Sequence, residues 1–157
     1  MMKIISGGQT GADLAALDAA IHLGLPHGGW LPRGRKTEAG PLPQSYRLKA
    51  LHSAKYRDRT QKNIQESDGT LIVSFGPLSG GSALTEALAI RYNRPCLHLD
   101  LTLMDQPMAV TTIKKWLDEY RIETLNVAGP RASGEPRIYR AVFDLLTAMQ
   151  WEDGKGQ

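Results

Sequence analysis

The chain has 157 residues, 41% of them hydrophobic, which is enough for one domain with a full hydrophobic core. Its 19 Lys and Arg against 16 Asp and Glu give a net charge of +3, too small to indicate a nucleic-acid partner by itself. A single cysteine excludes an internal disulfide and a cysteine-built metal site. No apolar run approaches the roughly 20 residues of a membrane span, and the amino terminus has no signal-peptide pattern, so we expect a cytoplasmic protein without a membrane partner.

Short apolar runs predict strands, and amphipathic stretches between them predict helices. The strands are expected at residues 3–6, 27–30, 70–74, 96–100 and 124–127. The helices are expected at residues 12–23, 56–67, 83–93, 108–120 and 137–151. This alternation predicts a Rossmann-like three-layer α/β/α sandwich with a mainly parallel sheet of five or more strands. We therefore expect a single Rossmann-like ligand-binding domain over residues 1–151, followed by a flexible tail at residues 152–157.

Residues 31–53 are predicted to form a long loop, because "LPRGRKTEAGPLPQ" contains three prolines and two glycines and has no hydrophobic period. Lysines and arginines crowd into the stretch from Arg33 to Lys62. This stretch either meets an anionic ligand or a nucleic-acid backbone, or is a solvated basic face. Because only Tyr46 and Tyr56 stand among these cations, stacking on nucleic-acid bases is poorly supported, and we expect no nucleic-acid partner.

Three loops that follow predicted strands have the same chemical character: "SGGQTGAD", "SFGPLSGGS" and "NVAGPRASG". Ligands of parallel α/β sheets bind outside the carboxyl ends of the strands, where such loops lead into helices. Glycines let backbone N–H groups approach a ligand, helix starts present unpaired donors, and Ser and Thr add hydroxyls. Phosphate suits these donors. The spacing matches neither GxGxxG nor the Walker sequence, which disfavours an NAD dehydrogenase or a P-loop NTPase.

The candidate ligand-binding residues come from these loops and from arginines that could clamp a phosphate. They are Gly7, Gly8, Gln9, Thr10, Gly11, Asp13, Gly80, Gly81, Ser82, Thr85, Arg33, Arg35 and Arg131. Asp13 either stabilises the start of its helix or contacts a ligand hydroxyl or a cation. Ser82 is the predicted N-cap of a helix that begins at Ala83. The four histidines have no paired ligand spacing, so we expect no protein metal site.

The stretches "SGGQTGADLAALDAAIHLGLPHGGWLPRGRKTEAGPLP", "YRDRTQKNIQESDGTLIVSFGPLSGGSALT" and "LNVAGPRAS" resemble the putative molybdenum carrier family, within the LOG-like (lysine-decarboxylase-like, SLOG) Rossmann superfamily. The resemblance extends from Ile4 to about Leu146. It implies a phosphate-containing small-molecule ligand, either a nucleotide or a molybdopterin-type cofactor, and self-association as a homo-oligomer. A candidate surface for self-association is the apolar face of the last helix, although a place in the core would explain that face equally well. Its residues are Ile138, Val142, Leu145, Leu146 and Met149.

A second resemblance is to the phosphoribohydrolases of the same superfamily. "RTQKNIQESD" places Arg59 eight residues before Ser67, the spacing at which those enzymes hold their catalytic arginine. Thr85 stands where their catalytic glutamate belongs, and Glu86 follows one residue later, where it is either a helix-dipole partner or a general base. The sequence therefore leaves two functions. One is a cofactor carrier or nucleotide-binding protein. The other is an N-glycosidase of nucleoside monophosphates with Arg59 and Glu86 as catalytic residues, in which Arg59 orients the phosphate or ribose and Glu86 or Asp13 stabilises positive charge on the ribose.

Overall fold

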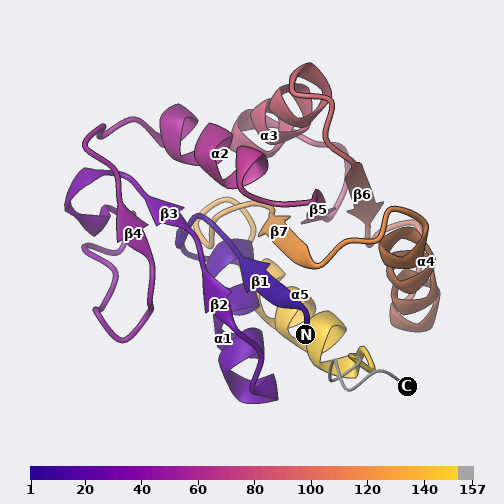
Figure 1. The fold of residues 1–157 in the computed structure, drawn as a ribbon. Coiled ribbons are helices and arrows are strands. Elements are labelled where there is room, and N and C mark those ends of the chain that lie inside the picture. Colours follow the sequence, from indigo (N-terminus) through magenta and orange to yellow (C-terminus); the bar gives the residue numbers. More distant parts are fainter. Residues whose placement is uncertain (152–157) are drawn as a thin grey trace.

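The computed structural model describes residues 1–151, which fold into a sheet covered by helices (Figure 1). The strands are β1 (Lys3–Ile5), β2 (His27–Gly28), β3 (Trp30–Leu31), β4 (Lys49–Ala50), β5 (Gly69–Ser74), β6 (Cys96–Asp100) and β7 (Thr124–Ala128). The α-helices are α1 (Ala12–Leu23), α2 (Tyr56–Gln65), α3 (Gly80–Arg91), α4 (Gln106–Glu119) and α5 (Ile138–Ala148). A short 3₁₀ helix, η1, spans Arg33–Arg35.

The central sheet has five strands in the order β2-β1-β7-β5-β6, and its neighbouring strands are parallel. β7 lies between β1 and β5, with Leu125 opposite Ile4 and Val127 opposite Leu71. Helices on both faces of a parallel sheet leave its central strands without solvent contact, and every residue of β5 is accordingly buried. The predicted Rossmann-like α/β sandwich with a parallel sheet is confirmed.

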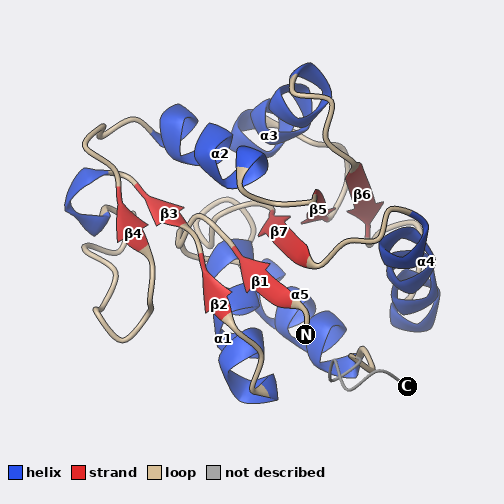
Figure 2. Ribbon diagram, in the orientation of Figure 1, coloured by secondary structure: helices blue, strands red, loops and turns tan. Residues whose placement is uncertain are grey.

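The helices form two layers, one on each face of the sheet (Figures 1 and 2). α2 and α3 pack together on one face, where Ile64, Leu88 and Ala89 form a small buried cluster. α1, α4 and α5 cover the other face, where the main core includes Leu71 and Val73 of β5. Each large aliphatic side chain buried in this way contributes about 1.5–3 kcal/mol to folding.

The apolar face of α5 belongs to this core. Its residues are at most 5% exposed: Ile138, Val142, Leu145, Leu146 and Met149. The core therefore accounts for the face that the sequence offered as a surface for self-association.

Residues 30–53, here called the insert, lie beside the central sheet and pack against α1 through Leu17 (Figure 1). β3 and β4 pair in parallel within the insert, with Trp30 opposite Lys49. The Arg35 guanidinium organises the chain between these strands by donating four hydrogen bonds of 2.7–2.9 Å to backbone carbonyls. These belong to Leu42, Pro43, Tyr46 and Leu48. A segment with little hydrophobic periodicity is thus ordered by one planar cation that reaches several carbonyls at once.

Most predicted elements agree with the structure to within three residues at each end. The prediction of a structureless loop over residues 31–53 was wrong, because the insert contains η1 and β4. The single strand expected at residues 27–30 is split into β2 and β3 at Gly29, which has φ +127° and would bring a Cβ within 2.1 Å of the Ser6 carbonyl oxygen. α3 begins at Gly80 with Ser79 at its N-cap, so the N-cap predicted at Ser82 was also wrong. The tail predicted at residues 152–157 lies outside the described residues.

Candidate functional site

A cavity of about 320 Å³ opens at the carboxyl ends of three neighbouring strands. Gly7 follows β1, Phe75 follows β5 and Gly129 follows β7, and all three residues line the cavity. The first turn of α3 forms another wall, and α2 contributes Tyr56 and Arg59. Its position is where parallel α/β sheets bind their ligands, and its size is at the small end of ordinary ligand pockets.

A buried ion pair between α1 and α2 forms part of the cavity wall. Arg59 Nη1 lies 3.6 Å from Asp13 Oδ2, and each side chain is 10% exposed. Arg59 Nη1 also donates to the Gly7 carbonyl at 2.5 Å, and the Gln9 amide donates to Asp13 Oδ2 at 3.2 Å. Burial raises the pKa of Asp13 from 3.8 to about 6, although Arg59, the Gln9 amide and Arg131 all lower it. Ion pairing therefore offsets only part of what desolvation costs this carboxylate.

The glycine loop after β1 has a closed hydrogen-bond arrangement. Gly7 has no side chain where Arg59 passes, and a Cβ there would lie 2.2 Å from Arg59 Nη1. Most of the loop's amides already have acceptors inside the protein: Gly8 N donates to Ser6 Oγ, Gln9 N to Asp13 Oδ2, Thr10 N to Gln9 Oε1 and Ala12 N to Pro130 O. The loop therefore does not present an open row of N–H groups to the cavity, and its main contribution is side chains such as those of Gln9 and Asp13.

The start of α3 supplies the open donors. Ser79 is the N-cap residue, and its side chain makes no capping hydrogen bond. Ser82 N donates to the Ser79 carbonyl at 3.1 Å, so among the described residues the N–H groups left without an acceptor at this helix start are those of Gly80 and Gly81. They lie at the positive end of the helix dipole. A Cβ added at Gly81 would meet nothing within 4 Å, so there is free space beside this residue, and Ser79 and Gly81 both line the cavity. Ser82, 7% exposed, also lines the cavity. An anion can therefore approach this helix start closely.

Gln9 is a further cavity residue with an unused donor. Its Oε1 accepts hydrogen bonds from the amides of Thr10 and Glu38, at 3.0 and 2.9 Å. Its Nε2 is buried and, within residues 1–151, has no hydrogen-bond partner. Leaving such a donor unpaired costs free energy, and an acceptor on a bound ligand would remove that cost.

The outer part of the cavity wall is held by contacts between the insert and the loop after β7. Glu38 accepts hydrogen bonds from Thr10 Oγ1, from Ser133 Oγ at 2.5 Å and from Ser133 N at 3.2 Å. Its Oε1 also lies 4.0 Å from Arg131 Nη1. These hydrogen bonds, led by the one from the Ser133 hydroxyl, lower the pKa of Glu38. The insert is thereby fastened beside Arg131, which lines the cavity.

The structure brings part of the predicted set together. The predicted residues that line the cavity are Gly7, Gln9, Asp13, Arg59, Gly81, Ser82, Thr85 and Arg131. The predicted residues outside its lining are Gly8, Thr10, Gly11, Gly80, Arg33, Arg35 and Glu86.

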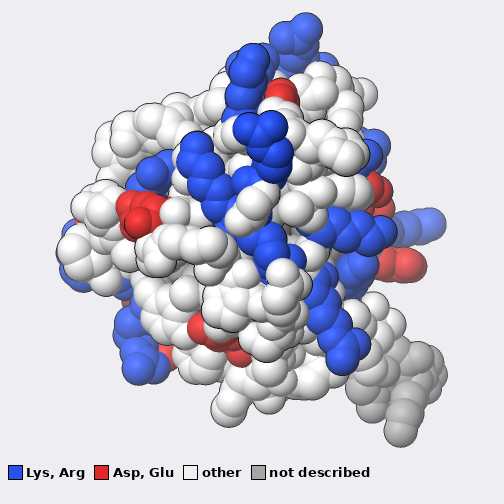
Figure 3. All heavy atoms as spheres, turned by 90° about the vertical axis from the view of Figure 1, so that its left-hand side faces the viewer, with Lys and Arg blue, Asp and Glu red and all other residues white. Residues whose placement is uncertain are grey.

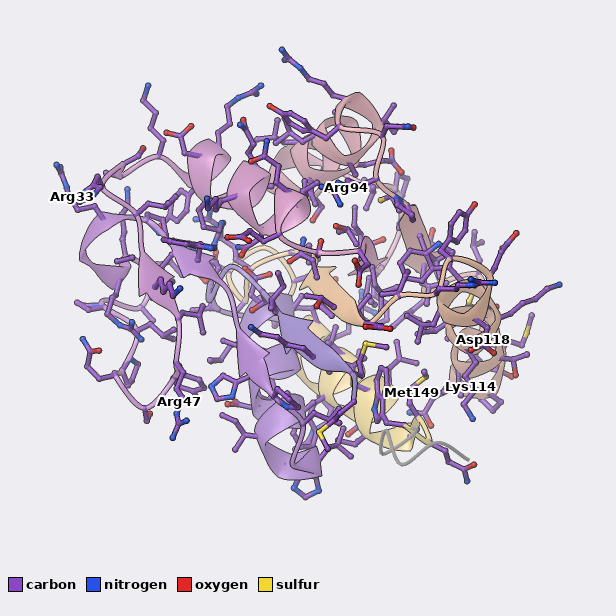
Figure 4. All side chains as sticks on the ribbon, viewed as in Figure 1. Arg33, Arg47, Arg94, Lys114, Asp118 and Met149 are labelled. Atoms are coloured by element: carbon purple, nitrogen blue, oxygen red, sulfur yellow. The ribbon has the colours of Figure 1, made fainter. Side chains whose placement is uncertain are left out.

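Four of the residues outside the lining have other surroundings. Arg33 extends into solvent at the edge of the insert (Figure 4), and Arg35 is occupied by four backbone carbonyls. Gly11 lies against the backbone of residues 130–132. Glu86 faces the region of Cys96, where its charge adds to burial in raising the pKa of the thiol to about 11. Of the three arginines predicted to clamp a phosphate, only Arg131 lines this cavity, where it is joined by Arg59.

Sequence reasoning missed several lining residues: Tyr56, Thr60, Ser74, Phe75, Asn126 and Glu135. Asn126 had a visible signal, because it is a polar residue near the end of an apolar strand and just before a glycine loop. It is 3% exposed, and its Nδ2 donates to Thr70 Oγ1 at 3.2 Å. Tyr56 had no such signal, because only the packing of α2 against the insert brings it to the cavity.

Within residues 1–151, no group of three or more His, Cys, Asp or Glu side chains is arranged to hold a metal ion. The same part of the chain has no helix that is both long and apolar enough to cross a membrane.

The parallel sheet, with its cavity at the carboxyl edge, defines a Rossmann-like α/β protein. The chain belongs to the circularly permutated YpsA SLOG family, whose model matches residues 4–150. It is also similar to a crystal structure of a putative molybdenum carrier protein from Syntrophus aciditrophicus SB, with 51% sequence identity and a TM-score of 0.94. That similarity covers 96% of each chain. No match was found among curated proteins.

Proposed function

We propose that this protein binds a phosphate-bearing small molecule, a nucleotide or a molybdopterin-type cofactor, in the cavity at the carboxyl edge of the sheet. The observation that carries the proposal is the open start of α3, which shares one cavity with Arg59 and Arg131. The phosphate lies at the first turn of α3, where Gly81 leaves room for it and Ser82 adds a hydroxyl. Arg59 and Arg131 add positive charge, and the side-chain Nε2 of Gln9 gains an acceptor.

The lining also suits the ring of such a ligand. Phe75, Leu78 and Leu84 give the cavity apolar surface, and Asn126 and Thr60 add polar groups at its wall. These residues fit either a nucleobase or a pterin. No cysteine or histidine stands among the lining residues within the described part of the chain, so the protein itself offers molybdenum no soft ligand there. A molybdopterin-type cofactor brings its own pair of sulfur ligands for the metal, and the protein would hold its phosphate and its ring.

Two measurements test the proposal. Small molecules released by denaturing the purified protein are identified by mass spectrometry, and we expect a nucleotide or a pterin phosphate. Binding of AMP, GMP and inorganic phosphate is then measured by isothermal titration calorimetry in wild type and Ser82→Ala. Loss of one hydroxyl donor to a charged phosphate should weaken binding about tenfold. Ser45→Ala, an exposed serine of the insert, is the matched control. No retained ligand together with no binding of these probes would refute the proposal.

A second candidate function is supported by the Asp13–Arg59 pair. An N-glycosidase of nucleoside monophosphates needs a carboxylate beside the ribose, and Asp13 lines the cavity whereas Glu86 does not. In this alternative, Asp13 stabilises positive charge that develops on the ribose, and Arg59 orients the phosphate. Incubation with AMP or GMP should then release free base, and Asp13→Asn should abolish the release while Glu86→Gln retains it. Saturable binding without base release would favour the carrier instead.

A further inference from the structure

Three cations surround the ring of Tyr56 at the outer part of the cavity. Lys36 Nζ lies 4.7 Å from the ring centroid, Arg131 Cζ 5.2 Å and Arg59 Cζ 5.3 Å. The three come from different segments: η1 ends just before Lys36, Arg59 lies on α2, and Arg131 lies in the loop after β7. The fold therefore gathers like charges around one aromatic ring that itself lines the cavity.

Carboxylates neutralise only part of this cluster. Asp13 pairs with Arg59, and Glu38 lies 4.0 Å from Arg131. Within residues 1–151, Lys36 forms no salt bridge. The face of an aromatic ring attracts an exposed cation only weakly and does not cancel the repulsion among three cations. The rim of the cavity thus keeps an excess of positive charge that an anion could neutralise.

We propose that the ligand extends out of the cavity along Tyr56 and carries a second anionic group, which Lys36 and Arg131 bind at the rim. This inference rests on the proposed function, in which the first phosphate lies at the start of α3. The ligand class is then a nucleoside diphosphate or a larger pyrophosphate-linked compound rather than a nucleoside monophosphate. Lys36 acts as a specificity-determining residue, because it reads the second anionic group and leaves the first untouched.

The other cations of the insert do not lie over an aromatic ring of the cavity. Lysines and arginines gather on the face that carries the insert (Figure 3), and Arg33 and Arg47 extend outward from it (Figure 4). Lys49 is a close counterpart of Lys36, since it is an exposed lysine of the insert that also lies over an aromatic ring, with Nζ 5.5 Å from the Trp30 centroid. Trp30, however, does not line the cavity. Comparing Lys49→Ala with Lys36→Ala therefore distinguishes the loss of one positive charge on this face from the loss of a charge beside the cavity.

The test compares AMP with ADP and GMP with GDP by isothermal titration calorimetry, so that each pair shares its base. In wild type, the diphosphates should bind about tenfold more tightly, as expected for one further charge-assisted contact. Lys36→Ala should remove most of this difference by weakening diphosphate binding, with monophosphate affinity unchanged within about twofold. Lys36→Arg should keep the preference, and Lys49→Ala should leave both affinities close to wild type. Higher salt should reduce the diphosphate preference, because the rim is exposed.

Two results would overturn the inference while leaving the proposed function standing: equal affinity for monophosphates and diphosphates, or equal effects of Lys36→Ala and Lys49→Ala. Absence of binding by any of the four nucleotides would overturn the proposed nucleotide site and this inference together. Lys36 is exposed, so its variants should melt at the wild-type temperature. Thermal unfolding of each variant checks this point.

Discussion

Substituting Asp13 should change how the stability of this protein depends on pH. Burial raises the pKa of Asp13 to about 6 in the folded protein, against 3.8 for an aspartate in the unfolded chain. The folded state therefore holds a proton at pH values where the unfolded chain has released it, so this group favours folding at low pH and loses that contribution as pH rises through 6. Between pH 4.5 and 7.5 the loss is about 2 kcal/mol, at 1.36 kcal/mol for each pKa unit.

Asp13→Asn removes this titration but retains an oxygen that can accept the Gln9 amide. The variant mimics the protonated carboxyl, in which Arg59 likewise has no charged partner. Its free energy of unfolding relative to wild type should therefore rise by about 2 kcal/mol between pH 4.5 and 7.5. Urea unfolding followed by the fluorescence of the buried Trp116 measures it. Asp144→Asn, which removes an exposed carboxylate, is the control. A relative stability of Asp13→Asn that stays constant over this pH range would refute the buried carboxylate described above.

Three further predictions concern the elements that shape the cavity. Arg35→Ala should destabilise the protein by about 2–3 kcal/mol and expose the insert to chymotrypsin at Tyr46, and Arg35→Lys should not rescue it, because an ammonium cannot reach four carbonyls. Gly129→Ala should cost about 1–3 kcal/mol in thermal unfolding, since its Cβ would lie 2.6 Å from the Val73 carbonyl oxygen. Gly81→Ala, which meets nothing within 4 Å, should stay within about 0.5 kcal/mol of wild type. Leu125→Ala, at a fully buried position in β7, should cost about 2–5 kcal/mol in urea unfolding, whereas Leu103→Ala, at a position 77% exposed, should cost almost nothing.

The strands and helices of this fold could be read from local patterns. β5 is a continuous apolar run with a polar end and a following glycine loop, and α1 has alanine and leucine at helical spacing. These signals are short-range, because burial on both faces of a strand or on one face of a helix is recorded within a few neighbouring residues. The glycine loops were recognisable for the same reason, since they follow strand ends directly.

The composition of the site depended on contacts between distant segments. β7 lies between β1 and β5, and this order places the three glycine loops at one edge. Arg35 and Arg131 both stand in stretches of sequence rich in glycine and proline, yet Arg35 binds backbone carbonyls while Arg131 reaches the cavity. Nothing in their immediate neighbours distinguishes them, because the acceptors that occupy Arg35 are brought to it by the folding of the insert.

Ser82 and Glu86 show the same difference between local sequence patterns and tertiary packing, within a single helix. The sequence correctly predicted a helix after "SFGPLSGGS", since its spacing is a local property. Its first residue and the direction of Glu86 depended on how α3 packs against the sheet, and a three-residue shift in the helix start moves Ser82 from the cap into the first turn. That a segment forms a helix follows from the periodicity of its own residues. The first residue of the helix, and the side chains that it turns toward a cavity, follow from packing between elements. Only the folded chain contains that information.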